Sequence, residues 1–134
     1  VASGKLRANE MFVNEARSIA SGRIAADRAS LPGLEVAARS ASATGATVSG
    51  AADAFLSYGD AAKAEALYNV ALNKPGADQA RVLTRLGIAQ LDQNNLAGAQ
   101  ATFARVPDGP REHIAQLWGL YAAQKAAPVA AAAP

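Results

Sequence analysis

The feature that most limits how this chain can fold is a near-repetition of one segment. "GDAAKAEALYNVALNKP", residues 59–75, returns as "NNLAGAQATFARVPDGP", residues 94–110, at an offset of 35 residues. Segments that recur at such a period are the signature of repeat architectures, in which one helical unit packs on the next. The offset brings small residues onto small residues and an aromatic onto an aromatic, at Ala52 and Gly87, Ala64 and Ala99, Tyr68 and Phe103, and Ala71 and Val106.

Composition indicates that the repeated units are helical. Alanine supplies 36 of the 134 residues, whereas Phe, Tyr and Trp together supply 7. Alanine is the best helix former, because it loses no side-chain entropy in a helix. Its small side chain also lets two helices approach closely, so we expect an all-α protein.

Capping residues and helix breakers place the expected helices. Ser30 is expected to cap a new helix with Pro32 in its first turn, and Asp60, Asp78 and Asn95 to start later ones. Positive φ is expected at the turn residues Gly59 and Asn94. The expected helices cover residues 9–29, 30–42, 46–58, 60–73, 78–93, 95–107 and 108–125.

The repeated pattern can be explained by tight packing of antiparallel helix pairs. If each hairpin is antiparallel, its small residues face each other, as Gly87 and Ala99 would in the second unit. Tyr68 and Phe103 then fill the space between neighbouring hairpins. For the last helix the pattern leaves two registers open, with either Leu117 and Tyr121 or Trp118 and Ala122 facing inward.

The two repeated segments resemble the tetratricopeptide repeat (TPR) family. "RLGIAQLDQNNLAGAQATF" and "AADAFLSYGDAAKAEALYNVAL" match its small, aromatic, small pattern, although Gln90 stands where the family carries an aromatic residue. The resemblance implies a right-handed α-solenoid of antiparallel hairpins closed by a C-terminal capping helix. It divides the chain into N-terminal helices that form a degenerate repeat or cap (1–44), two repeats with the capping helix (45–125), and a disordered Ala/Pro tail (126–134). Because the chain starts at Val1 instead of Met, we expect a piece of a longer array.

Several classes of function are disfavoured by the sequence. The chain has no Cys, its formal net charge is +2, and its basic residues are spread out instead of forming the patch that nucleic acid requires. No apolar run is long enough to span a membrane. His113 and Glu112 are adjacent on a helix and point in different directions, so they form no catalytic dyad. We therefore expect no enzyme, no metal and no cofactor.

The resemblance implies a protein-interaction module that holds a partner peptide or helix in a concave groove. The alternative is a structural end segment of a longer solenoid, or a homodimerisation unit without a dedicated ligand. The Ala-rich composition suggests a bacterial source and leaves cytoplasm and periplasm open. The groove is expected to be lined by Ser49, Asp53, Leu56, Ser57, Arg81, Thr84, Ile88 and Asp92, and by Gln116 and Leu120 if the last helix stacks in register.

Overall fold

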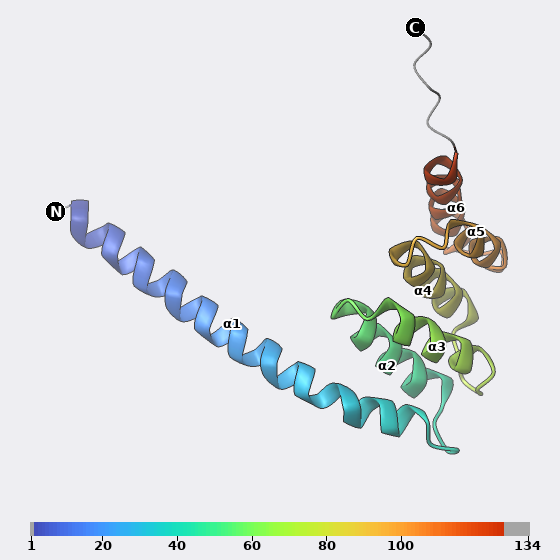
Figure 1. Ribbon diagram of the computed structural model, residues 1–134, viewed down its shortest axis with the longest axis horizontal. Helices are drawn as coiled ribbons and strands as arrows, with labels where there is room; N and C mark the ends of the chain where they lie inside the picture. The colour runs from blue at the N-terminus through green and yellow to red at the C-terminus, as the bar shows by residue number, and fades with distance from the viewer. Residues whose placement is uncertain (1, 128–134) are drawn as a thin grey trace, which may run out of the picture. The chain divides into compact units, whose positions relative to one another are not determined.

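The protein is all-helical over the part that its structure, a computed structural model, describes. This part is residues 2–127, with nothing stated for the side chains of residues 2–9, and it contains no strand. Contacts divide the chain after Gly33 into two units, each described here by itself. The helices are α1 (Ala2–Ala38), α2 (Gly45–Ser57), α3 (Ala61–Leu72), α4 (Gln79–Asp92), α5 (Leu96–Ala104) and α6 (Glu112–Ala126) (Figure 1).

α1 is one continuous helix, and the expected break at Ser30 is wrong. The Ser30 hydroxyl caps no new helix; it donates to the Asp27 carbonyl at 2.6 Å, one turn back in the same helix. Pro32 lies inside α1, where it removes a single N–H donor. Gly33 follows it, then the better helix formers Leu34 and Glu35, and Glu35 pairs with Arg39 at 2.8 Å one turn on. The helix therefore continues past the proline and ends at Ala38, short of the expected Ser42.

The end of α1, from Leu34 on, and the turn after it belong to the second unit and pack within it. Ala38 and Ala43 are buried, and the Lys63 ammonium of α3 lies 2.9 Å from the Glu35 carboxylate. Lys74 donates to the Ala41 carbonyl at 3.3 Å. The ammonium of Lys63 and the guanidinium of Arg39 hold the pKa of Glu35 below its usual value. The sequence predicts that residues 1–44 form a degenerate repeat or a cap. For the part of α1 before Leu34, this stays a prediction.

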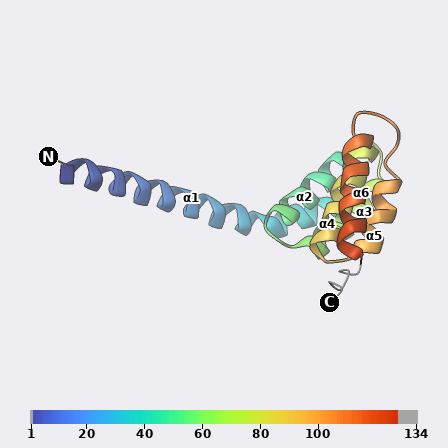
Figure 2. The ribbon, with the colours of Figure 1, turned by 90° about the horizontal axis from the view of Figure 1, so that it is seen from above.

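In the second unit, each helix packs on the one that follows it. α2 packs on α3, α3 on α4, α4 on α5 and α5 on α6, as Figures 1 and 2 show. Only Tyr58, Gly59 and Asp60 join α2 to α3, and a connection this short makes the two packed helices antiparallel. Residues 93–95 join α4 to α5 in the same way.

Local capping sets where these helices begin. The expected starts at Asp60, Asp78 and Asn95 are confirmed, and Thr44 caps α2, which was expected from residue 46 and begins at Gly45. Each of the four side chains accepts a hydrogen bond from the backbone N–H three residues on, at Thr47, Lys63, Arg81 and Gly98. Positive φ is confirmed at both turns, 85° at Gly59 and 60° at Asn94.

The core uses small residues where helices meet. Ala52, Ala64 and Ala99 are completely buried. Gly87 lies directly under the Phe103 ring, since a Cβ on Gly87 would come within 2.4 Å of a ring carbon. Phe103 in turn stacks on Trp118 of α6, with ring centroids 6.3 Å apart. One aromatic side chain thus joins α4, α5 and α6.

α6 packs through its small residues. Ala115 and Ala122 are buried, and Trp118 is half-buried against the same cluster. Leu117 and Tyr121 are exposed. Of the two registers that the sequence left open, the structure has the one with Trp118 and Ala122 inward. α6 ends at Ala126, and residues 128–134, most of the expected disordered tail, lie outside the described residues.

Candidate functional site

Two of the expected groove residues, Asp53 and Arg81, meet in a polar cluster that joins three helices. Asp53 of α2 accepts a hydrogen bond from the Tyr68 hydroxyl of α3 at 2.5 Å. Its other carboxylate oxygen pairs with the Arg81 guanidinium of α4. Two residues that the sequence analysis expected only to line the groove therefore form a direct ion pair, which the Tyr68 hydroxyl reinforces.

The cluster keeps Tyr68 in its neutral form. Its side chain is fully buried, and burial, followed by the hydrogen bond to the Asp53 carboxylate, raises the pKa of Tyr68 well above its usual value. The phenol therefore acts as a hydrogen-bond donor throughout the physiological pH range. Because Asp53 accepts this hydrogen bond and pairs with the Arg81 guanidinium, its negative charge is balanced within the protein.

The hydroxyl groups expected in the groove bond to their own helices. Ser49 donates to the Ala46 carbonyl at 3.2 Å, and Ser57 to the Ala54 carbonyl at 2.8 Å. Thr84 donates to the Ala80 carbonyl at 2.7 Å. Ser49 and Thr84 are also buried, while Ser57 is exposed. These hydroxyl protons are satisfied within each helix, which reduces their value as donors to a partner.

The remaining expected groove residues differ in exposure. Leu56 is half-buried, Ile88 is half-buried against the core and Asp92 is exposed. Gln116 and Leu120 line a shallow groove between α5 and α6. That groove is lined by Gln100, Phe103, Ala104, Ala115, Gln116, Gly119, Leu120 and Ala123.

A second polar network, around Gln90, was not anticipated from the sequence. Gln90 is buried; its amide nitrogen donates to Glu65 of α3 at 3.1 Å, and its amide oxygen accepts from the Thr102 hydroxyl of α5 at 2.6 Å. Gln93 donates to the other Glu65 oxygen at 2.6 Å. The sequence signal was that Gln90 replaces an aromatic residue of the repeat, which Phe55 supplies in the first unit. A hydrogen-bonded link thus takes the place of a ring.

The other feature that sequence reasoning missed is an apolar surface on α6. Four large side chains there are exposed although the helix packs well on its other side. They recur every three or four residues, which places them on one side of the helix. This α6 apolar face consists of Ile114, Leu117, Leu120 and Tyr121, with relative exposures of 48%, 67%, 68% and 47%.

The α6 apolar face carries no acidic or basic residue, and a basic residue borders it. The Lys125 ammonium lies 5.9 Å from the centre of the Tyr121 ring, and the edge of that ring meets Trp118, with centroids 5.9 Å apart. Tyr121 is thus held on both sides while its outer surface stays open. Large apolar side chains gathered on one exposed surface are typical of an interaction site.

Comparison with known proteins does not assign a function. Neither a protein-family model, nor a curated protein, nor a solved structure matches the chain. Within the described residues, no helix is long and apolar enough to cross a membrane. In the same part of the chain, no three His, Asp or Glu side chains gather as ligands for a metal ion.

Proposed function

We propose that residues 45–127 form a TPR-like protein-interaction module, built as a right-handed α-solenoid. The proposal is supported by the 35-residue echo in the sequence together with the packing of α2 to α5 in two antiparallel pairs. Equivalent positions in the two pairs also share a turn residue with positive φ, Gly59 and Asn94. In this arrangement α6 is the first helix of a third unit and closes the array.

The observation that carries the binding role is the α6 apolar face. Leu117 and Tyr121 are exposed, although few other large apolar side chains in residues 45–127 are. Burial of one Leu side chain contributes about 1.5–3 kcal/mol, so these residues can anchor a partner. The proposed partner is a protein segment that presents apolar side chains at helical spacing.

The module is proposed to act by binding, without catalysis. The polar side chains that could have reacted with a substrate are engaged internally: Asp53 with Tyr68 and Arg81, and Thr84 with its own helix. The Asp53 cluster is proposed to hold α2, α3 and α4 in register, so that a rigid surface is presented to the partner.

The proposal can be tested with peptides selected against the purified protein. Helical peptides enriched from a random displayed library are measured by isothermal titration calorimetry against the wild type and Leu117→Ser. We expect binding to weaken at least about tenfold, since a tenfold change corresponds to about 1.4 kcal/mol and burial of Leu exceeds this.

Val70→Ser is the matched control, because Val70 is also a large apolar residue, 42% exposed, but lies on α3. Its affinity for the same peptides should equal that of the wild type. Equal binding to Leu117→Ser and the wild type, or a selection that enriches no binding peptide, would show that the α6 apolar face is not the binding surface.

A further inference from the structure

The shallow groove between α5 and α6 is the open edge of the core that joins α4, α5 and α6. This α5–α6 groove has a volume of about 370 Å³. Apart from Gln100 and Gln116, the residues that line it are apolar or glycine. Phe103 and Ala115 line the groove and also belong to the buried core cluster. The groove is therefore continuous with contacts that already hold helices together in this chain.

The packing of α5 shows what occupies such an edge one step earlier in the chain. α5 lies on α4, with the Phe103 ring over Gly87. Gln90 of α4 then links α5 to α3, because it accepts a hydrogen bond from Thr102 and donates one to Glu65. A helix with an aromatic side chain is thus seated against two consecutive helices, α3 and α4.

The offset of 35 residues makes the α5–α6 groove the counterpart of that place. Gln100 lies 35 residues after Glu65, and Phe103 lies 35 residues after Tyr68. Gln100 and Phe103 both line the groove, and Glu65 is the α3 residue that α4 links to α5. The groove therefore lies beside α5 at the position that corresponds to the place of α5 beside α3.

α6 presents small residues to the groove, as α4 presents Gly87 to α5. Gly119 lies inside α6, where glycine is less favourable than alanine. A Cβ at Gly119 would meet only the Cβ of Phe103, at an ordinary 3.7 Å, so packing within the chain does not require this glycine. With Ala115 and Ala123 one turn before and after it, Gly119 lets another helix approach α6 closely.

The exposed side of α6 also indicates that a further helix belongs beside it. The end of a repeat array is protected by a cap with a polar outer surface. α6 instead exposes Leu117 and Leu120, by 67% and 68%. Leu120 belongs both to the α6 apolar face and to the lining of the groove, so the two apolar surfaces adjoin.

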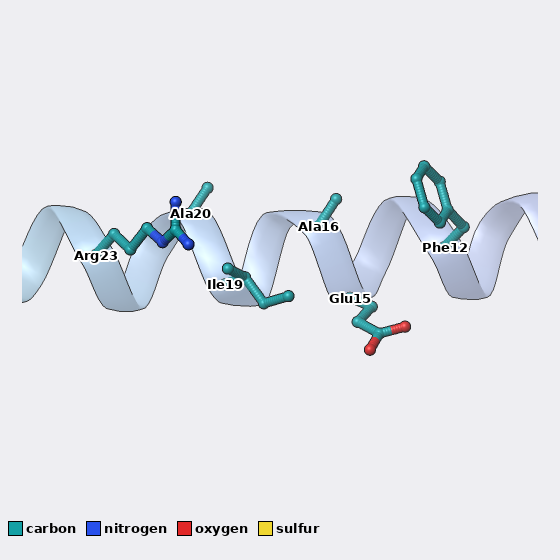
Figure 3. A pocket seen from close by; sticks show the side chains of 6 residues that line it. All are labelled: Phe12, Glu15, Ala16, Ile19, Ala20 and Arg23. Carbon is teal, nitrogen blue, oxygen red and sulfur yellow. The ribbon is translucent and has the colours of Figure 1, made fainter.

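The exposed apolar side chains of α1 give no comparable indication. Figure 3 shows Phe12, Ala16 and Ala20 projecting from one edge of that helix, with Ile19 across its front. Every residue in the range 10–30 is exposed, and nothing within the described part of the chain shows what covers them. The α5–α6 groove differs because the chain itself seats a helix in the corresponding place.

We propose that the α5–α6 groove holds a helix of a partner protein, which takes the place of the second helix of a third unit. The partner helix has the pattern of α3 and α5, a small residue followed four residues later by an aromatic one, as in Ala64 and Tyr68 or Ala99 and Phe103. Its ring lies against Gly119. This inference rests on the repeat architecture of the proposed function and adds a site next to the α6 apolar face.

A helical peptide with the sequence of α3 is the probe for this site. It spans residues 60–74 and carries Ala62→Lys and Ala66→Glu, joined by a lactam on the exposed side, because a free peptide of this length forms little helix in water. Titrated calorimetrically into the whole chain, it should bind and should shift the amide NMR signals of Gly119 and Ala123. The same peptide with Tyr68→Ala should bind at least about tenfold more weakly, since it lacks the ring to be buried.

Gly119→Leu fills the groove, and Gly50→Leu is its matched control. Both glycines lie inside helices, and an added Cβ meets no close neighbour at either position. Gly119→Leu should bind the α3 peptide at least about tenfold more weakly than the wild type, whereas Gly50→Leu should bind it equally well. Circular dichroism should show the wild-type helix content in both variants.

Leu117→Ser separates this site from the α6 apolar face, since Leu117 does not line the groove. It should bind the α3 peptide as the wild type does, although it loses affinity for peptides selected against the α6 apolar face. A wild type that does not bind the α3 peptide, or a Gly119→Leu that binds it equally well, would overturn the groove and leave the proposed function standing. Binding lost in Leu117→Ser and kept in Gly119→Leu would also overturn it, by placing the peptide on the α6 apolar face.

Discussion

Two glycine-to-alanine substitutions in equivalent backbone settings test the packing described for α4 and α5. Gly87 of α4 and Gly50 of α2 are both inside helices, where alanine is favoured over glycine by about 1 kcal/mol. An added Cβ at Gly50 meets nothing within 4 Å, whereas at Gly87 it comes within 2.4–2.8 Å of three Phe103 ring carbons. The same chemical change is therefore made with and without a steric clash.

The expected effects have opposite signs. Gly50→Ala should raise the free energy of unfolding by about 0.5–1 kcal/mol. Gly87→Ala gains the same helix preference, but the Phe103 ring is buried and stacked on Trp118, so it cannot swing away freely. Overpacking of this kind costs about 1–3 kcal/mol. The two variants should therefore differ by about 1–3 kcal/mol, with Gly50→Ala the more stable.

Urea unfolding followed by circular dichroism measures this difference. The two unfolding free energies are compared with the same slope of free energy against urea concentration. Trp118 is the sole tryptophan of the chain and touches Phe103, so its fluorescence reports any displacement of the ring. It should change in Gly87→Ala and not in Gly50→Ala. If Gly87→Ala is as stable as Gly50→Ala and leaves the fluorescence unaltered, the Phe103 ring does not lie over Gly87.

Two further predictions concern the polar contacts. The pKa of Tyr68 is raised in the folded protein, so the native state keeps a proton that the unfolded state loses above about pH 10. The free energy of unfolding should therefore fall as the pH rises beyond about 10, by up to about 1.4 kcal/mol per pH unit. Urea titrations at pH 8–11 should show a smaller decline for Tyr68→Phe. Gln90→Phe, which restores the aromatic residue of the repeat, should destabilise by about 1–3 kcal/mol, because the buried Thr102 hydroxyl loses its acceptor. Thr102→Val in the same chain should recover part of that loss in thermal unfolding.

The helix boundaries of the second unit were predictable because their causes are local. Asp60, Asp78 and Asn95 each accept a hydrogen bond from an N–H three residues away. The turn at Gly59 depends on the backbone freedom of one residue. The break expected at Ser30 also rested on local signals, but α1 continues through Pro32 and Gly33, and the Ser30 hydroxyl bonds to the Asp27 carbonyl of the same helix.

The candidate site was less predictable, because it depends on contacts distant in sequence and on the register of one helix. The sequence analysis expected Asp53 and Arg81 to line one groove, but the buried Tyr68 that completes their cluster approaches from a third helix. Gln116 and Leu120 were expected to continue the groove if the last helix stacked in register. In the structure, Ala115 and Ala122 pack on the core cluster, and Gln116 and Leu120 line a groove beside α5.

The Asp53 cluster also constrains how this protein can change over evolution. An apolar seam between helices tolerates many replacements of similar size, but a seam closed by a carboxylate, a phenol and a guanidinium works only when all three arrive together. Deleting the hairpin of α2 and α3, or exchanging it for one that lacks Asp53 and Tyr68, would leave Arg81 facing a surface without its counter-ion. The contacts therefore require that α4 follow a hairpin that carries both Asp53 and Tyr68. A recombinant with another hairpin before α4 must include these two residues.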